Sequence, residues 1–108
     1  MRDVSAEEPD RALGEEDRLV LVSFWHQGCE PCRELRRELE RLEDGVCLVL
    51  AVDADRHPEA SARTRVSEFP TVVFFKHGVE VHRFRGGALP PSMHPTRWRG
   101  EPAAPQQT

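Results

Sequence analysis

The chain has 108 residues, of which 38% are hydrophobic and 31% charged, and its net charge at pH 7 is −4. This length suits one domain, and the negative charge argues against nucleic acid as the main partner. The longest apolar run, residues 19–25, is too short to cross a bilayer, and the acidic segment 1–8 lacks the apolar stretch of a secretory signal.

The first half of the chain predicts a strand, a helix and a second strand after a polar lead-in. Residues 1–18 hold seven acidic residues and three arginines and have room for one short helix. The nearly continuous apolar run 19–25 favours a central strand that is buried on both faces. From Cys29 to about Asp44, leucines recur at helical spacing, and Gly45 suits the helix end. The apolar run 46–52 predicts the second strand, and the helix between the two strands is long enough for a parallel crossover.

The second half predicts a helix, a hairpin and a tail. Pro58 suits the first position of a helix that continues to about Ser67. Residues 71–76 and 79–85 are rich in β-forming residues, and the short turn between them predicts a hairpin whose second strand lies at an edge. Residues 90–108 contain five prolines and no helical periodicity, which predicts an irregular tail.

Two of the three cysteines, Cys29 and Cys32, lie where the first strand gives way to the first helix. The free N–H groups at a helix N-terminus favour a thiolate, which lowers the pKa of a thiol there and makes it nucleophilic near neutral pH. Two intervening residues place both sulfur atoms in one helical turn, and Pro31 suits that turn. We expect Cys29 to be exposed and to attack, and Cys32 to be shielded and to resolve.

Metal binding is the alternative chemistry for two cysteines separated by two residues. A tetrahedral zinc site needs two further ligands, and Cys47, His26, His57 and His82 show no spacing typical of one. Cys47 lies within a predicted strand, so we expect an ordinary buried side chain, and we predict no metal site. His26, three residues before Cys29, is either a proton-transfer group or a plain loop residue.

These residues resemble the active-site segment of the thioredoxin family. The run 22–25 before Cys29-Glu30-Pro31-Cys32 matches that segment, and Phe69-Pro70-Thr71 is similar to the family's cis-proline loop. Residues 75–78 resemble the hairpin that follows this loop in the family, and residues 86–89 resemble the glycine after the family's last strand. The resemblance covers roughly residues 19–89.

The resemblance implies an α/β thioredoxin-like three-layer sandwich with a central mixed sheet. We predict that this domain spans residues 19–89, after a polar segment at 1–18. The Pro-rich tail at 90–108 leaves the fold without a regular C-terminal helix. Leu89, Met93 and Trp98 are candidates to cover the vacated face.

The resemblance also implies that the chain acts as a protein-disulfide reductase. The Cys29 thiolate attacks a substrate disulfide, and Cys32 then attacks Cys29 and releases the reduced substrate. Pro70 would be cis, and the backbone of Phe69 would pair with an extended substrate segment. The implied substrate-binding residues are Trp25, Gly28, Glu30, Pro31, Phe69, Pro70 and Thr71.

The resemblance implies that the protein works in the cytoplasm. The implied processes are electron transport and cell redox homeostasis. We expect no bound cofactor and no membrane partner. Electrons would come from a thioredoxin reductase or a low-molecular thiol, and the substrates would be proteins that contain disulfides.

Four positions depart from the family pattern. Ser23 replaces a buried aspartate that helps move the proton of the resolving cysteine, and Val49 replaces its lysine partner. Gly28 replaces a tryptophan, and Glu30 places a carboxylate beside Cys29, where it should raise the thiol pKa. We therefore expect a slow or strongly reducing exchanger. The lost acid and closing helix also favour a second hypothesis, a thioredoxin-like adaptor that binds a partner without catalysis.

Overall fold

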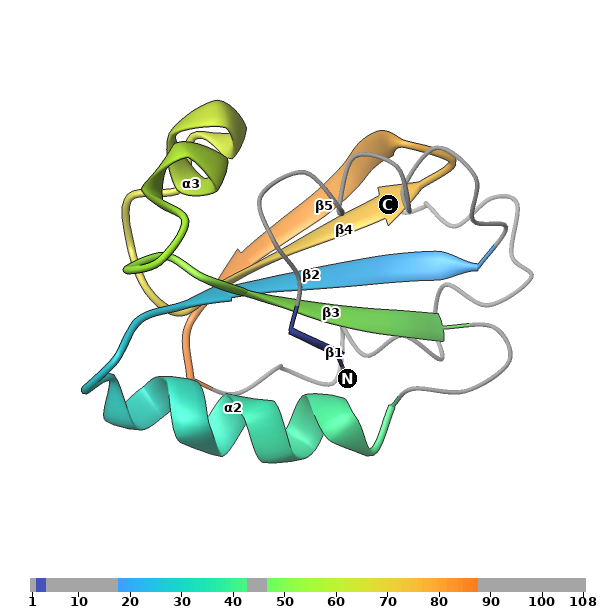
Figure 1. The fold of residues 1–108 in the computed structure, drawn as a ribbon. Coiled ribbons are helices and arrows are strands. Elements are labelled where there is room, and N and C mark those ends of the chain that lie inside the picture. The colour runs from blue at the N-terminus through green and yellow to red at the C-terminus, as the bar shows by residue number, and fades with distance from the viewer. Residues whose placement is uncertain (1, 4–17, 43–46, 88–108) are drawn as a thin grey trace.

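The computed structural model describes residues 2–3, 18–42 and 47–87, which form a five-stranded sheet with one helix on each face (Figure 1). In chain order the elements are β1 (Arg2–Asp3), β2 (Leu19–Trp25), α2 (Glu30–Glu40), β3 (Cys47–Asp53), α3 (Pro58–Thr64), β4 (Thr71–Lys76) and β5 (Val79–Arg85). No helix in these residues is long and apolar enough to cross a membrane.

The sheet is mixed, as predicted, and its strand order is β1-β3-β2-β4-β5. Strand β2 pairs in parallel with β3 and antiparallel with β4, and β4 forms an antiparallel hairpin with β5. The hairpin turn places His77 at φ 51° and Gly78 at φ 81°, the two positive angles of the turn that suits the twist of paired strands. The ends of β2 and β3 and the start of β4 thus meet at one edge of the sheet (Figure 1, left).

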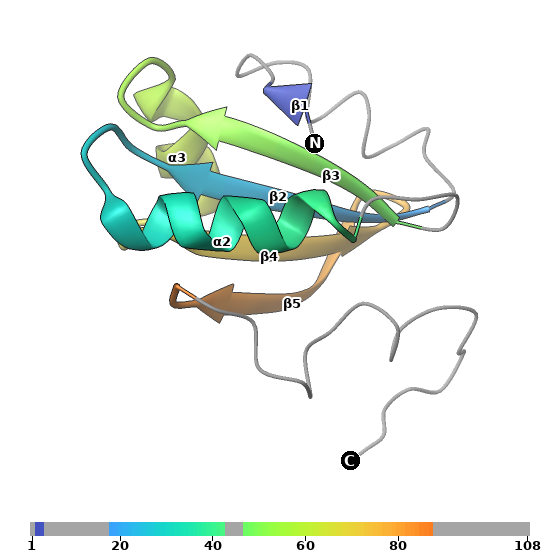
Figure 2. The same ribbon diagram turned by 90° about the horizontal axis from the view of Figure 1, so that it is seen from below.

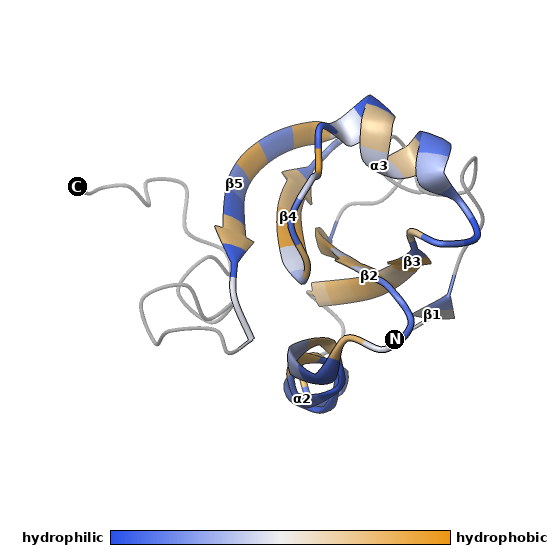
Figure 3. Ribbon diagram, turned by 90° about the vertical axis from the view of Figure 1, so that its left-hand side faces the viewer, coloured by the Kyte–Doolittle hydropathy of each residue, from blue (hydrophilic) through white to orange (hydrophobic). Residues whose placement is uncertain are grey.

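The hydrophobic core lies in two layers because successive strand side chains point to opposite faces. On the α3 side, Val20, Val22 and Phe24 of β2 join a cluster that includes Ala60. On the α2 side, a second cluster contains Leu19, Leu21, Leu35, Leu39, Leu42, Cys47, Val49, Val72 and Phe74. Figure 2 shows α2 in front of the sheet and α3 behind it, and Figure 3 shows the apolar strands between the two helices, which confirms the three-layer sandwich. Cys47 is fully buried, as expected.

Both helices are shorter than the sequence pattern predicts. Helix α2 ends at Glu40 with Arg41 as its C-cap, before the predicted end near Asp44, and residues 43–46 lie outside the described part. Helix α3 ends at Thr64 because Arg65 adopts a left-handed conformation at φ 61°, a position for which glycine is the usual signal.

The first strand was missed. Arg2–Asp3 pairs in parallel with β3, where the sequence predicts only a polar lead-in with room for a short helix. The Asp3 carboxylate accepts two hydrogen bonds from the Arg36 guanidinium, at 3.2 and 3.1 Å, so an ion pair links this strand to α2. A two-residue strand carries no periodicity that a sequence pattern can reveal. The short helix expected within 1–18 and the tail at 90–108 fall outside the described residues.

Arg83 of β5 fixes the end of α3. Its guanidinium donates hydrogen bonds to the carbonyl oxygens of Thr64 and Arg65, at 2.8 and 3.0 Å, and to the carboxylate of Glu80. These bonds supply partners for carbonyl groups that the end of a helix leaves unpaired. They also hold the chain that leads into Phe69.

We expect Arg83→Ala to lower the free energy of unfolding by about 1 to 3 kcal/mol, since it removes charge-assisted bonds to two carbonyl groups. Urea unfolding of the variant and of Arg83→Lys measures this effect. Lysine keeps the charge but cannot donate hydrogen bonds to both carbonyl groups in the same geometry, so it should recover only part of the lost stability. Equal stability of all three proteins would contradict the role of Arg83.

The same contact has a pH dependence of defined sign. The hydrogen bond from Arg83 lowers the pKa of Glu80, more than burial raises it. A depressed carboxyl pKa stabilises the folded state above the unfolded-state pKa, and this contribution disappears as the pH falls through the folded-state pKa. The stability difference between the wild type and Arg83→Ala should therefore shrink in acid.

Candidate active site

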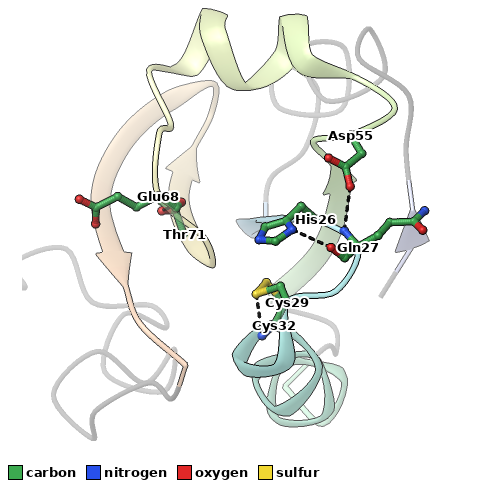
Figure 4. The surroundings of a disulfide bond; sticks show 7 residues. All are labelled: His26, Gln27, Cys29, Cys32, Asp55, Glu68 and Thr71. Carbon is green, nitrogen blue, oxygen red and sulfur yellow. Dashed lines mark hydrogen bonds between the residues drawn. A yellow bond between two sulfur atoms is a disulfide. The ribbon is translucent and has the colours of Figure 1, made fainter.

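Cys29 and Cys32 form a disulfide at the junction of β2 and α2, with their Cα atoms 5.3 Å apart (Figure 4). Gly28, at φ 83°, makes the turn out of the strand in a backbone conformation that other residues rarely adopt. Cys29 then stands as the N-cap of α2, and its Sγ accepts the Cys32 backbone N–H at 3.2 Å. Pro31 lies in the first helical turn, as predicted.

The two cysteines are almost equally buried, whereas the sequence predicts an exposed Cys29 and a shielded Cys32. Cys29 is 7% exposed and Cys32 is 6% exposed, so the expectation of an exposed Cys29 is wrong for this disulfide form. The reason is that the Cys29 sulfur turns inward, where it caps the helix and bonds to Cys32.

A cavity of about 360 Å³ lies against the disulfide. The described residues that line it are Ser23, Trp25, His26, Gln27, Gly28, Cys29, Cys32, Arg33 and Arg36, and none of them carries a carboxylate. Ser23, at 4% exposure, and Val49, at 0%, occupy the buried positions where the family pattern has its acid and its lysine. The site therefore lacks both charges, and its cavity reaches the resolving cysteine.

The cis-proline loop faces the cysteine-bearing loop. The Phe69–Pro70 peptide is cis, as predicted. The rings of Phe69 and His26 meet edge to face with centroids 5.3 Å apart, so the two loops are in direct contact. The Thr71 hydroxyl donates to the Glu68 carbonyl at 2.6 Å, and Thr71 is fully buried. Its observed role is to fix this loop, and its contact with a substrate stays a prediction.

The remaining predicted residues surround the disulfide. Trp25 is half-buried and lines the cavity, and its indole N–H has no hydrogen-bond partner among the described residues. Glu30 and Pro31 are exposed on the first turn of α2. An added Cβ at Gly87 would lie 3.0 Å from Pro31, so the chain after β5 also passes close to this turn.

Sequence reasoning missed the residues that hold the β2–α2 loop. The Asp55 carboxylate accepts the Gln27 backbone N–H at 2.9 Å (Figure 4). The Asp53 carboxylate accepts a bond from the Gln27 side chain at 3.4 Å. Asp53 is the last residue of β3 and Asp55 lies two residues further on, so the end of an apolar run is the signal in the sequence that points to them. Among the residues that the structure places, no group of three His, Cys, Asp or Glu side chains is arranged to hold a metal ion.

We expect Glu30→Gln to raise the reactivity of the reduced Cys29 thiol by less than about fivefold, because exposed charges interact by at most about 1 kcal/mol. The Glu30 side chain is 78% exposed and lies 3.5 Å from Arg33, so solvent and a cation both screen it. Alkylation rates across pH measure the effect, with Glu34→Gln as the matched control on the same helix. A lower rate in Glu30→Gln would contradict the expected sign.

Comparison with known proteins finds that this chain is similar to thioredoxins. The family model described as Thioredoxin matches residues 1–93. The chain is 43% identical to a thioredoxin of Chlamydia caviae over 70 residues, which is 63% of this chain and 69% of that protein. It is 33% identical to thioredoxin-2 of Saccharomyces cerevisiae over 84 residues, 76% of this chain and 81% of that protein.

Solved structures agree with the sequence comparison. The structure of Fasciola hepatica thioredoxin superposes with a TM-score of 0.75 at 37% identity, covering 81% of this chain and 88% of that one. The family model covers most of the chain, and the cysteine pair forms the disulfide that thiol exchange requires. This chain therefore belongs to the thioredoxin family and is a thiol–disulfide oxidoreductase.

Proposed function

We propose that this chain reduces disulfide bonds in protein substrates and that Cys29-Glu30-Pro31-Cys32 is its active-site motif. The observation that carries the proposal is the closed Cys29–Cys32 disulfide at the N-terminus of α2, beside the cis-proline loop. The closed form is the product of such a reduction, and the helix N-terminus stabilises the thiolate of the open form.

The reaction moves two electrons from the dithiol to the substrate. The Cys29 thiolate attacks one sulfur of the substrate disulfide, and the other substrate sulfur leaves as a thiolate that takes a proton from water. Cys32 loses its proton and attacks the Cys29 sulfur. This attack forms the Cys29–Cys32 bond and releases the second substrate thiolate. In the closed form both cysteines line the same cavity.

An extended segment of the substrate would lie along Phe69. Among the bonds within the described residues, none occupies the Phe69 backbone N–H or carbonyl, whereas the Pro70 carbonyl accepts the Gly86 N–H at 3.2 Å. Free main-chain groups beside a strand support recognition by strand addition, which tolerates many substrate sequences. We include Trp25 and Gly28 in the substrate-binding region because they line the cavity, Glu30 and Pro31 because they are exposed beside the disulfide, and Pro70 and Thr71 because they follow Phe69 in the cis-proline loop.

The electron donor in this proposal is a thioredoxin reductase or a low-molecular thiol. The protein would work in the cytoplasm, where it would contribute to electron transport and redox homeostasis. Cys47 is buried and forms no disulfide within the described residues, which is compatible with a reducing compartment.

Insulin reduction tests the proposed function. The chain, supplied with dithiothreitol, should accelerate precipitation of the insulin B chain well above the rate with dithiothreitol alone. Failure to accelerate it while still binding partner proteins would support the adaptor hypothesis and contradict the reductase.

A further inference from the structure

The cavity beside the disulfide contains one side chain suited to move a proton, the imidazole of His26. We propose that His26 accepts the proton of Cys32 and returns it, in place of the buried acid that Ser23 has replaced. This inference rests on the proposed reductase function and names a further residue for the same reaction.

The hydrogen bonding of His26 leaves one ring nitrogen available. Its Nδ1 lies 2.8 Å from the Gln27 carbonyl oxygen, which can only accept, so Nδ1 carries a proton. In the neutral ring, Nε2 then holds the lone pair and is the basic nitrogen. The edge-to-face contact with Phe69 fixes the ring from the other side.

His26 and the reacting sulfur atoms line one cavity. The ring lies next to the Cys29–Cys32 disulfide, and the Cys29 backbone N–H bonds to the His26 carbonyl at 3.4 Å (Figure 4). At about 30 Å³ per water molecule, a cavity of about 360 Å³ has room for water between Nε2 and Cys32. Proton transfer through one water is an efficient route for a general base.

The charged groups around His26 are engaged elsewhere. From the end of β3, Asp53 and Asp55 bind Gln27. From the cis-proline loop and β5, Glu68 lies 3.8 Å from Arg85. From α2, Arg33 pairs with Glu30, and Arg36 pairs with Asp3 and Glu40. No carboxylate in the described residues bonds to the His26 ring.

The proton balance of the step is complete. In the mixed disulfide, the Cys32 thiol gives its proton through water to His26 Nε2 and its sulfur attacks Cys29. The Cys29–substrate bond breaks, and the substrate leaves as a thiolate. The imidazolium then returns the proton to that thiolate or to solvent. When a reductant reopens the disulfide, the Cys32 sulfur leaves as a thiolate, and the ring takes a proton from solvent on Nε2 and passes it to that thiolate through water.

We test His26→Gln against a matched control, His57→Gln, which removes an imidazole at the start of α3. The measurement is the single-turnover rate of mixed-disulfide resolution as a function of pH. We expect His26→Gln to slow resolution by at least about a hundredfold, the lower end of the range for general acid–base catalysis, and His57→Gln to leave the rate unchanged. The pH profile of the wild-type rate should contain a step that depends on the imidazole, and His26→Gln should lack this step.

Restoring the family acid separates a proton-transfer role from a packing role. In the double variant His26→Gln with Ser23→Asp, the new carboxylate lies in the same cavity and should recover most of the rate. Far-ultraviolet circular dichroism and a second substitution, His26→Ala, control for misfolding.

Two outcomes would overturn the proposal. One is an unchanged rate and pH profile in both His26 variants. The other is a loss that Ser23→Asp does not rescue, which would assign His26 a packing role. Either result would leave wild-type insulin reduction intact, whereas an inactive wild type would contradict the reductase itself.

Discussion

Replacing Cys29 by serine is expected to reduce insulin-disulfide cleavage to the rate of dithiothreitol alone. Serine keeps the N-cap geometry and nearly the same volume, but its hydroxyl is not ionised near neutral pH and cannot form the disulfide with Cys32. The fold should survive, because serine is a preferred N-cap residue. The loss of activity should therefore come with unchanged circular dichroism.

The companion variant, Cys32→Ser, should show a different defect. Cys29 can still attack a substrate disulfide, but nothing resolves the product, so a mixed disulfide accumulates and is visible by non-reducing electrophoresis and intact mass. Cys47→Ser is the matched control for both variants, since Cys47 is fully buried within β3, and it should retain activity. Full activity in Cys29→Ser would contradict the assignment of the nucleophile.

The second large effect is on stability. We expect Leu39→Ala to lower the free energy of unfolding by about 2 to 5 kcal/mol, because it removes a large buried side chain and leaves a cavity. Leu39 is fully buried between α2 and the sheet, in the cluster that contains Phe74. A loss of this size is a large fraction of the total stability of a small domain.

Urea unfolding with an unchanged slope measures the loss. Arg37→Ala is the control on the same helix, since Arg37 is exposed and alanine favours helix. It should change the stability by less than about 0.5 kcal/mol. A Leu39→Ala variant as stable as Arg37→Ala would show that α2 does not depend on this face for packing.

The hydrophobic pattern of the chain predicts the sheet well, because each buried strand spans both core layers. The runs at β2, β4 and β5 coincide with the predicted strands, and β3 is shifted by one residue at each end. The resemblance of Cys29, Cys32 and Phe69-Pro70 to the thioredoxin family pattern indicated which loops meet. These signals are local and strong, so the fold class follows from them.

Other features depend on tertiary contacts and leave little trace in the sequence. Helix α3 stops at Arg65 in a left-handed conformation, and the carbonyl groups of its last turn bind Arg83 from a distant strand. The two residues of β1 pair with β3, and Asp3 binds Arg36 of α2. Such partners are distant in sequence, so periodicity and turn signals cannot find them.

The candidate active site also combines features that the sequence predicts with features that only the structure reveals. Cysteine spacing predicts a redox pair, but the burial of Cys29 depends on the direction of its sulfur as a helix cap. The absence of the acid at Ser23 is plain in the sequence. That His26 lines the same cavity as Ser23 and Cys32 is visible only in three dimensions.

The most direct measurement is a redox titration of the wild-type chain against thiol–disulfide buffers, with acid trapping and mass mapping of each cysteine. Cys29 and Cys32 should convert together and reversibly between a disulfide and two thiols, at a potential near or below about −270 mV. Cys47 should stay in the thiol form throughout. If Cys29 and Cys32 show no reversible joint transition, this pair is not the redox centre of the chain.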